Sequence, residues 1–547
     1  MPKISLDSVT FTDEDDIVPL SGKAILDNTS LFKVVNTLAG NDILTGDNET
    51  EGEYGFSYVA FNNESTLNTG EGNDSITGIV SQKADFSWEH FGIFNDRLFS
   101  NVDPGTIDTG DGDDVITGII QPDIFGNGIE NSDGSIDTGD GNDKIIGTTQ
   151  TNIGIYDRKG SINTGNGQDT ITGTAGFLGI QIGTYLGPQL QSVLDTGKDN
   201  DIITGIGGEG VDPDSPTLYG SSRIGIWNFA TFNTDDGDDI ITGIGRVSPR
   251  GSYGIINQEN GAINTGNDND IITGMGGNVG IENSGFFQKG TINTGNGNDT
   301  INAIGGHTGL FNTGTIDVSD GNDIINAIGG TYGLANIGTI DVSDGNDSII
   351  SHGKFFNSGL VLLGDGNDSI IADADLSNRI LENLGVIRTG DGNDIINSKG
   401  IIYNQGIIET GNGDDSMIVD GGVDDNGTRY GIYNNGGAIN MGDGNDSITA
   451  NEGFQSDFNS SGAWFLGEGD DYIKGYGSGD FYGGNGNDTL ELTPGTYTVG
   501  IWGEGGESPI FTKGNQLMIT SEFEKLKAGN IIYDFTSLTA GQIIFVA

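Results

Sequence analysis

The sequence has no cysteine and is poor in proline, histidine and basic residues. Without Cys in 547 residues, disulfide bonds, thiolate metal sites and cysteine nucleophiles are excluded. The three histidines, His90, His307 and His352, are scattered, and neither an HExxH nor a GxSxG motif is present. No run approaches 18 consecutive apolar residues, so the sequence predicts no membrane-spanning helix. These absences favour a chain without a common hydrolase site, and we expect no enzymatic activity.

Basic charge and a signal peptide are also missing. Lys and Arg total 22 against 79 Asp and Glu, a formal net charge of −57, which excludes nucleic-acid binding because phosphate contacts need a basic surface. The start of the chain, MPKISLDSVTFTDEDDIVPL, has no basic segment followed by an apolar one, so no ordinary signal peptide is predicted. A compact fold with this charge repels itself unless its surface is solvated or its carboxylates bind cations.

Glycine is what the sequence has in excess. It occurs 97 times against 10 prolines, yet no G-X-Y period runs through the chain, so a collagen helix is excluded. Hydrophobic residues make up 33%, which is too many for a simply disordered chain. Because glycine adopts positive φ without steric cost, this composition indicates many tight turns between short apolar strands.

One motif recurs along almost the whole chain, for example as NTGEGNDSITG, DTGDGDDVITG, NTGNGNDTINA and RTGDGNDIINS. Each copy contributes one aspartate immediately before a short apolar segment, and successive copies lie 17 to 40 residues apart. The seventeen motif aspartates are Asp42, Asp74, Asp114, Asp143, Asp169, Asp201, Asp239, Asp270, Asp299, Asp323, Asp347, Asp368, Asp394, Asp415, Asp446, Asp471 and Asp488. Such self-similarity is typical of a stacked repeat protein.

A second motif precedes most copies, as in GIENSDGSIDTG and GIINQENGAINTG. One full repeat therefore reads G-I-x-N, then G-x-I, then T-G-x-G-N-D-x-I, which is three short alternating segments bounded by Gly or Asn. The shortest repeats of the main array have 21 residues, enough for three short strands and tight turns. The sequence thus predicts an all-β, right-handed parallel β-solenoid with about three short strands per coil, each coil burying its apolar face against its neighbours.

Two Ile positions and one Asn position recur at fixed places in the repeat. We expect the isoleucines to stack as apolar ladders and the asparagines to form a hydrogen-bonded structural ladder at a corner. The isoleucines include Ile116, Ile171, Ile241, Ile272, Ile301 and Ile325 in one slot, and Ile136, Ile162, Ile263, Ile292, Ile316 and Ile340 in the other. The asparagines include Asn131, Asn257, Asn283, Asn312, Asn336 and Asn434.

The glycine–aspartate turn has the chemistry of a calcium site. Ca²⁺ takes six to eight oxygen ligands, and a turn with two glycines supplies backbone carbonyls while the aspartate adds a carboxylate. One turn cannot fill that shell, but two turns stacked at about 4.8 Å can hold an ion between them. Besides the aspartates, the predicted ligand positions include Gly70, Gly72, Gly110, Gly112, Gly139, Gly141, Gly165, Gly167, Gly295, Gly297, Gly390, Gly392, Gly442, Gly444, Gly484 and Gly486. About sixteen inter-coil ions would supply roughly +32, offsetting over half of the negative charge.

The motif G-x-G-x-D-x-I resembles the nonapeptide G-G-x-G-x-D-x-L-x of the RTX (hemolysin-type calcium-binding) family of type I-secreted proteins. Residues 483–491, GGNGNDTLE, match the full pattern. Asp471 and Asp480 lie just before this segment, and with Asp488 inside it they are 9 and 8 residues apart, which is close to nonapeptide spacing. The resemblance implies a short RTX β-roll over 461–492, with sites on both edges and Asp480 as a further ligand. It also implies secretion in an unfolded state, followed by folding in extracellular calcium.

The resemblance divides the chain into an N-terminal cap (1–35), a β-solenoid with one ion column (36–460), the β-roll (461–492) and a C-terminal cap with a secretion signal (493–547). The main array departs from the family at the first Gly, which is replaced by Thr69, Thr109, Thr138, Thr164 and Thr294. Turns with further changes, DTGKDND, NTGNDND and the two DVSDGND copies, are expected to be weaker sites.

Together these features predict an extracellular or cell-surface, calcium-binding structural or matrix protein. Its predicted partners are calcium ions, further copies of itself in filaments or a surface layer, and cell-surface polysaccharide. One alternative is a polysaccharide-acting enzyme that uses only carboxylates. Another is an adhesin or ice-binding protein that uses a threonine face from Thr117, Thr172, Thr204, Thr242 and Thr273. Inserted loops, with Phe86 and Trp88, either pack onto one corner or form a partner site.

Overall fold

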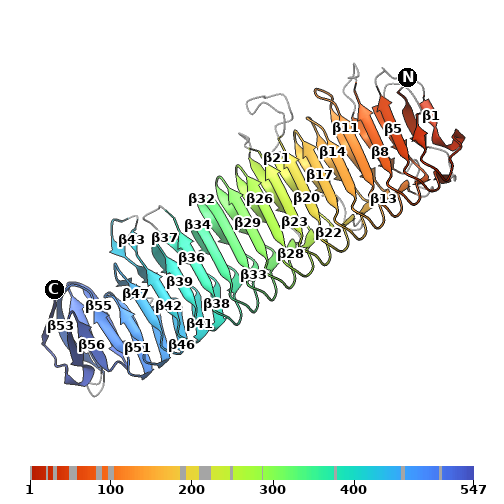
Figure 1. The fold of residues 1–547 in the computed structure, drawn as a ribbon. Helices are drawn as coiled ribbons and strands as arrows, with labels where there is room; N and C mark the ends of the chain where they lie inside the picture. The colour runs from red at the N-terminus through yellow and green to blue at the C-terminus, as the bar shows by residue number, and fades with distance from the viewer. Residues whose placement is uncertain are drawn as a thin grey trace. The chain divides into compact units, whose positions relative to one another are not determined.

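A computed structural model describes most of the chain. The described residues are 3–19, 23–28, 34–48, 58–81, 89–96, 104–184, 192–208, 223–246, 251–285, 288–374, 379–424, 426–456, 462–503 and 508–547. They form two compact units, unit 1 (Met1–His307) and unit 2 (Thr308–Ala547). Each unit is a stack of β-coils joined by parallel strand pairing (Figure 1), so the predicted parallel β-solenoid is confirmed. The aromatic residues Phe86 and Trp88 lie outside the described residues.

After the first coil, which has β1 (Lys3–Ser5) and β2 (Ile17–Val18) alone among the described residues, each coil of unit 1 has three short strands, and equivalent strands of successive coils pair in register. We call them the first strand row (G-I-x-N), the second strand row (G-x-I) and the third strand row (I-T-G). The first row comprises β1 (Lys3–Ser5), β3 (Ile25–Asn28), β6 (Tyr58–Asn63), β9 (His90–Asp96), β12 (Gly126–Ser132), β15 (Ile153–Asp157), β18 (Leu178–Ile182), β21 (Arg223–Asn228), β24 (Ser252–Asn257) and β27 (Val279–Asn283). The second comprises β4 (Val34–Asn36), β7 (Thr66–Asn68), β10 (Thr106–Asp108), β13 (Ser135–Asp137), β16 (Ser161–Asn163), β19 (Val193–Asp195), β22 (Thr231–Asn233), β25 (Ala262–Asn264) and β28 (Thr291–Asn293). The third comprises β2 (Ile17–Val18), β5 (Ile43–Asn48), β8 (Ser75–Val80), β11 (Val115–Ile120), β14 (Lys144–Thr148), β17 (Thr170–Ala175), β20 (Ile202–Gly207), β23 (Ile240–Gly245), β26 (Ile271–Gly276) and β29 (Thr300–Gly305).

Unit 2 repeats this plan, although in two coils the third and first rows run together as the long strands β32 (Ile324–Asn336) and β34 (Ser348–Asn357). Its other first-row strands are β30 (Thr308–Asn312), β37 (Arg379–Asn383), β40 (Ile401–Asn404), β45 (Ile432–Asn434) and β48 (Phe454–Gln455). Second-row strands are β31 (Thr315–Asp317), β33 (Thr339–Asp341), β35 (Leu360–Leu362), β38 (Val386–Asp391), β41 (Ile407–Asn412), β46 (Ala438–Asp443), β49 (Ala463–Gly469) and β51 (Gly479–Gly486). Third-row strands are β36 (Ser369–Asp373), β39 (Ile395–Ser398), β42 (Ser416–Val419), β47 (Ser447–Ala450), β50 (Tyr472–Lys474), β52 (Thr489–Leu492) and β56 (Lys525–Ala528). A small hairpin, β43 (Gly422–Val423) and β44 (Arg429–Tyr430), projects from one coil.

The core of each coil is a thin apolar layer between the strand rows. All twelve isoleucines predicted to form ladders are completely buried, which confirms their place in the core. Burial of such a side chain contributes roughly 1.5–3 kcal/mol, and the β-branched shape suits a pleated surface. The first and third rows approach closely where their glycines meet. A Cβ on Gly205 would lie 2.3 Å from the carbonyl oxygen of Gly225, so the layer has no room for a side chain there.

The predicted asparagine ladder is also confirmed. The amide Nδ2 of Asn257 donates to Oδ1 of Asn283 at 2.9 Å, and that of Asn312 donates to Asn336 at 2.8 Å. Each amide is fully buried and reaches a backbone carbonyl of the following coil as well, for example Asn257 to Thr291 O at 2.8 Å. In one coil of unit 1 the position is Asp157, which accepts from Asn131 Nδ2 at 2.8 Å. The row is therefore a structural element that satisfies buried backbone groups.

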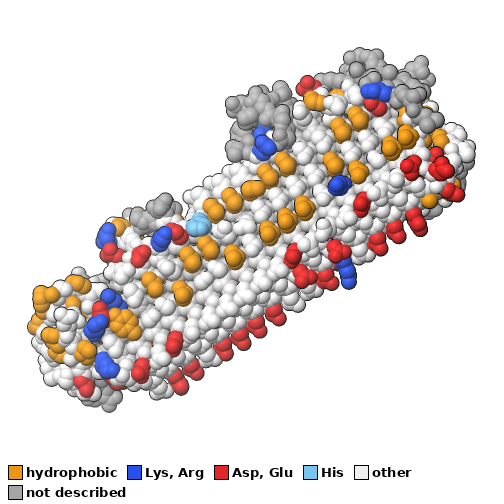
Figure 2. Space-filling view, in the orientation of Figure 1, with side chains coloured by type: hydrophobic (Ala, Val, Ile, Leu, Met, Phe, Trp, Pro, Cys, Tyr) orange, Lys and Arg blue, Asp and Glu red, His pale blue; other side chains and the backbone are white. Residues whose placement is uncertain are grey.

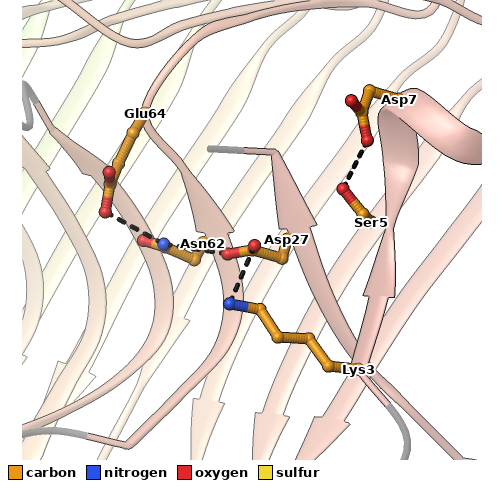
Figure 3. Close-up of polar contacts among 6 residues, drawn as sticks. All are labelled: Lys3, Ser5, Asp7, Asp27, Asn62 and Glu64. Atoms are coloured by element: carbon orange, nitrogen blue, oxygen red, sulfur yellow. Dashed lines mark hydrogen bonds and ion pairs between the residues drawn. The ribbon is translucent and has the colours of Figure 1, made fainter. Parts of the chain in front are cut away.

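The described residues of the predicted N-terminal cap (1–35) and C-terminal cap (493–547) belong to the β-structure of their own units, and their roles as caps stay predictions. Before residue 36, β1 pairs with β3, β2 pairs with β5, and the 3₁₀ helix η1 (Leu6–Ser8) places Leu6 in the core. Polar contacts cover this end on the outside: Lys3 Nζ lies 2.8 Å from Asp27 Oδ2, and Asn62 Nδ2 donates to Asp27 and Glu64 (Figure 3). In unit 2 the end of the chain turns antiparallel through β53 (Gly495–Trp502), β54 (Ser508–Lys513), β55 (Gln516–Ser521), β57 (Ile531–Asp534), the 3₁₀ helix η2 (Phe535–Ser537) and β58 (Ile543–Val546).

No helix among the described residues is long and apolar enough to cross a membrane.

Candidate metal centre

The repeated motif forms a tight turn between the second and third strand rows, so that the turns of one unit stack along one edge. Its two glycines adopt left-handed backbone conformations, as at Gly110 (φ 79°) and Gly112 (φ 149°). A Cβ on either residue would lie 1.9 Å from a carbonyl oxygen of the preceding turn, that of Gly70 or Gly72. Glycine is thus required both for the turn and for the close approach of the next coil. The carbonyl oxygens of Gly70 and Gly72 thus face the next turn, whereas the carbonyl of Asp111 accepts the N–H of Gly72 in the preceding turn.

The motif aspartates form a continuous ladder inside this edge of each unit. Oδ1 of each aspartate accepts the backbone N–H of the aspartate one coil earlier, for example Asp114 from Asp74 at 2.7 Å and Asp143 from Asp114 at 2.8 Å. The same bond recurs from Asp42 to Asp299 in unit 1 and from Asp323 to Asp488 in unit 2, at 2.7–2.9 Å. One carboxylate oxygen therefore belongs to the backbone ladder, a role that the sequence analysis did not foresee.

The second oxygen, Oδ2, is left without a protein hydrogen bond in a buried position. This holds for fifteen described motif aspartates, each at most 2% exposed. They are Asp42, Asp74, Asp114, Asp143, Asp169, Asp201, Asp239 and Asp270 in unit 1, and Asp347, Asp368, Asp394, Asp415, Asp446, Asp471 and Asp488 in unit 2. A buried ionised oxygen without a partner is costly, and such groups in proteins are paired or bind metal ions.

Burial changes the acidity of the ladder. It raises the pKa of Asp114 and Asp143 to about 7 and that of Asp201 to about 8, because the charged form loses solvation. The polar hydroxyls of Thr109, Thr138 and Thr196 in the same turns partly offset the effect. The neighbouring residue of the same turn behaves in the opposite way. Asp113 lies on the outer side and its pKa is lowered, since the backbone and side-chain amides of Asn142 donate to it. The turn therefore separates a solvated acid from a buried one.

The donor set fits calcium. Each turn offers one buried carboxylate oxygen together with backbone carbonyls directed toward the next turn, and all of them are hard oxygen ligands. No three acidic or imidazole side chains come together as a metal cluster within the described part of the chain. A site here would therefore consist of one aspartate per turn and backbone oxygens from adjacent turns, as the sequence predicts for the motif glycines.

Turns that depart from the motif keep its geometry. Asp199 (φ 84°) and Asp268 (φ 87°) occupy the second glycine position in a left-handed conformation, and Ser319 (φ 57°) and Ser343 (φ 52°) occupy the first. Asp tolerates this region better than most residues, because its short side chain bonds locally. The corresponding aspartates still belong to the ladder, as Asp201 and Asp347 illustrate. Their weaker calcium binding remains a prediction.

The structure extends the ladder at both ends to residues that the sequence analysis missed. Asp16 donates its backbone N–H to Asp42 Oδ1 at 2.8 Å, and so takes the motif position in a segment, TDEDDI, without glycine. In unit 2, Glu524 Oε2 accepts from Asp488 N at 2.7 Å. The signal in the sequence that could have identified Asp16 as a ladder residue is its place directly before the apolar Ile17, as in the motif copies.

Asp480 is the one predicted ligand placed away from the ladder. It lies in β51, where it is half-buried and pairs with Ala463 of β49, whereas Asp471 N donates directly to Asp488 Oδ1 at 2.9 Å. Asp471 and Asp488 are thus consecutive members of one ladder, seventeen residues apart. The prediction of a second edge of sites through Asp480 is wrong, because its turn-like spacing falls within a second-row strand.

Two other features lie outside the ladder. Along the outer face of the third strand row in unit 1, Thr172, Thr204, Thr242 and Thr273 are aligned in register and half-buried. Partly exposed isoleucines such as Ile202 flank them, and rows of hydrophobic side chains are visible on the surface in Figure 2. On the first row, Glu89 and Glu130 are held by Asn152 and Asn127, whose amides donate to them at 2.7 Å. Burial raises the pKa of Glu130 to about 7.

Comparison with known proteins gives little additional information. No family model and no curated protein matches the sequence. Among solved structures, the chain is similar to a hyperactive, Ca²⁺-dependent, β-helical antifreeze protein from an Antarctic bacterium, with 18% identity over 80% of this chain and 84% of that one. The TM-score is 0.25, and a likeness of this strength carries no argument about function.

Proposed function

We propose that this chain is an extracellular, RTX-like structural protein whose coils are held together by calcium ions along the aspartate ladder. The observation that supports it is the row of buried Oδ2 atoms without hydrogen-bond partners in both units. Protonation would neutralise these oxygens in the absence of metal, but a divalent cation neutralises them at neutral pH and uses the adjacent backbone carbonyls as well. The net charge of −57 makes such neutralisation important for the folded state.

Calcium binding of this kind couples to folding, because the ligands of each site come from adjacent coils. In low intracellular calcium the chain would remain unfolded and suited to export, and it would fold at the millimolar concentrations outside the cell. Export by a type I pathway, with a signal in the C-terminal segment, belongs to this proposal.

Circular dichroism during calcium titration tests the proposal directly. Starting from the full-length protein in a chelator at pH 8, we expect β-structure to appear as calcium reaches millimolar levels, with many ions bound per chain by equilibrium dialysis. A chain that is fully folded in the chelator and binds no calcium would overturn the proposal.

Self-association is the structural use that we propose for the folded chain. Electron microscopy of the calcium-loaded protein is expected to reveal filaments or sheets, and light scattering should show their dependence on calcium. Strictly monomeric particles at all concentrations would limit the role to that of a single-chain spacer.

A catalytic role is not part of this proposal. Hydrolysis of a glycosidic bond generally uses a pair of carboxyl groups on either side of the bond. A described groove on the first strand row of unit 1 has a volume of about 350 Å³, and among its lining residues Glu282 is the single acid. This arrangement favours binding over hydrolysis.

A second candidate is an ice-binding role for the threonine face. What supports it is the register of Thr204, Thr242 and Thr273, which places hydroxyl and methyl groups about 4.8 Å apart along the stack. Flanking Ile202 and Ile271 are 45% and 39% exposed, so the face is partly apolar. Thermal hysteresis measured for the wild type and for Thr204→Lys tests it. Equal freezing points with and without wild-type protein would exclude it.

A further inference from the structure

The outer face of the first strand row in unit 1 carries an aromatic groove. It has a volume of about 350 Å³ and is lined by Phe177, Ile224, Trp227, Tyr253, Ile256, Gln258 and Glu282. Pockets of this size that combine aromatic walls with a few polar groups are typical ligand sites. The groove lies on strands β18, β21, β24 and β27 and the residues beside them, on the opposite side of the coil from the threonine face.

The floor of the groove is rigid. Trp227, Ile256 and Glu282 occupy the same position in three consecutive coils, and Ile224 and Tyr253 are likewise paired in register. Ile224 and Ile256 also belong to a buried cluster with Ile153 and Leu178, against which Phe177, Trp227 and Tyr253 pack. Because parallel strands fix these side chains, the aromatic surface exists before any ligand binds, which lowers the entropic cost of binding.

A short polar chain lines one side of the groove. Trp227 Nε1 donates to Gln258 Oε1 at 3.3 Å, and Gln258 Nε2 donates to Glu282 Oε1 at 2.9 Å and to Ser284 Oγ at 3.1 Å. Ser284 Oγ also donates to Glu282 Oε1 at 2.9 Å. An oriented amide and carboxylate therefore lie beside an aromatic ring, and this combination suits a ligand with both an apolar face and hydroxyl groups.

We propose that this groove binds a neutral polysaccharide chain. A pyranose ring has a C–H face that stacks on an aromatic ring and hydroxyls that bond to amides and carboxylates. The equivalent row continues through Tyr156 and Gln181 in the preceding coils, so a chain lying along the stack meets a new side chain about every 4.8 Å. Glu282 lies in the groove and repels polyanions, so we expect uronic-acid polymers to bind more weakly than neutral ones. Calcium enters this inference only as a requirement for folding.

The test is a titration of the full-length protein, in calcium, with cellohexaose and laminarihexaose as neutral probes and oligogalacturonate as the acidic one. Isothermal calorimetry and tryptophan fluorescence are expected to show binding of at least one neutral probe. Trp227→Ala should weaken it at least tenfold, since the indole forms the floor of the groove. Trp502→Ala is the matched control, because Trp502 is 61% exposed in unit 2 and remote from the groove residues in sequence.

Three results would overturn the inference: no binding of either neutral probe, wild-type affinity in Trp227→Ala, or stronger binding of the acidic probe. Circular dichroism in calcium checks that Trp227→Ala folds. Glu282→Gln provides a second variant that keeps the shape of the groove, and we expect it to alter affinity for the neutral probe while leaving the calcium titration unchanged. If calcium does not fold the protein, circular dichroism shows this before any sugar is added. That result would contradict the proposed function and not the sugar-binding groove.

Discussion

The two carboxylate oxygens of a motif aspartate have different surroundings and therefore different roles. In Asp114, Oδ1 accepts the backbone N–H of Asp74, which joins adjacent coils, while Oδ2 is buried without a protein hydrogen bond. The neighbouring Asp113 accepts two amide hydrogen bonds at the surface. Adjacent residues in one turn thus provide a buried acid and a solvated acid.

Asp114→Asn tests the role of Oδ2. The asparagine can keep the Oδ1 hydrogen bond, so in calcium we expect a loss of about 1–3 kcal/mol in the free energy of unfolding, because a metal ligand becomes an amide. In chelator the same variant should be as stable as the wild type or more stable, since a buried carboxylate has been removed. Urea unfolding followed by circular dichroism measures both values.

Asp113→Asn is the matched control for that experiment. Its side chain is exposed, so we expect changes within about 0.5 kcal/mol in either condition. If Asp114→Asn and Asp113→Asn were equally harmless in calcium, the ladder would be a metal-free structural feature.

Within the asparagine ladder, one position carries an ionisable group. Burial raises the pKa of Asp157 to about 7, partly offset by hydrogen bonds from Ser192, Asn131 and Gly160. Its ordinary pKa is 3.8, so the folded state holds the proton more tightly than the unfolded state. The resulting stabilisation is complete below pH 3.8 and is lost as the pH rises toward and through about 7.

Asp157→Asn removes this dependence. Relative to the variant, the wild type should lose about 1–3 kcal/mol of stability between pH 5 and pH 8, measured by urea unfolding in calcium at each pH. Asp123→Asn, at an exposed turn position, is the control variant and is measured over the same pH range. A constant difference between Asp157→Asn and the wild type would mean that Asp157 is not protonated in the folded state at pH 5.

At the level of elements, the asparagine ladder connects the coils through buried amides. Asn357 Nδ2 donates to Asn383 Oδ1 at 2.9 Å and to Val386 O at 3.0 Å, and Asn357 Oδ1 accepts from Asn336 at 2.9 Å. We expect Asn357→Leu to cost about 3 kcal/mol, because it leaves buried polar groups of both neighbouring coils unsatisfied. Thermal unfolding in calcium measures this.

The control for Asn357→Leu is Asn346→Ala on the exposed side of a turn. Asn346 also forms ladder hydrogen bonds, but water can replace them, and a cost below about 0.5 kcal/mol is expected. Similar losses of stability in both variants would show that buried and exposed ladder hydrogen bonds contribute equally to the stability of the fold.

The repeat made the elements predictable, because one period carries strands, turns and ladders together. The Ile, Asn and Asp positions represented by Ile116, Asn257 and Asp114 recur at a constant place in the repeat. Stacking of the coils therefore places equivalent side chains next to one another. Asp480 illustrates the limit of this argument, since its local sequence resembles a turn but the coil places it within β51. Spacing along the chain does not determine which residues fall at the corner when a coil shortens.

The ends of the ladder and the outer groove were not predictable for a different reason. Asp16 and Glu524 complete the ladder through contacts with Asp42 and Asp488, and neither has the motif glycines around it. Trp227 and Glu282 come together only through the register of three coils, whose lengths differ because of insertions. Both features depend on stacking between coils, which no local sequence pattern records.

For the whole molecule, the question is whether the charge of −57 needs only screening or needs ions at fixed positions. Mobile salt screens charges over about 8 Å at physiological ionic strength, whereas adjacent rungs of the ladder are about 4.8 Å apart and buried. Sodium chloride therefore reaches the outer acids but not the inner ones. Mg²⁺ requires a near-ideal octahedral shell and gives up its water reluctantly, so it suits a set of backbone carbonyls poorly.

We therefore expect calcium at a few millimolar to fold the chelated protein at pH 8, while 0.5 M sodium chloride or equal magnesium leaves it largely unfolded. Circular dichroism at fixed protein concentration, with potassium chloride to match ionic strength, distinguishes these cases. Folding by sodium chloride alone would mean that general screening of the acidic surface is sufficient. A flexible site of six to eight oxygens binds Ca²⁺ in preference to Mg²⁺. Folding by magnesium at the same concentration as calcium would therefore mean that the turns neutralise charge without selecting the ion by its coordination shell.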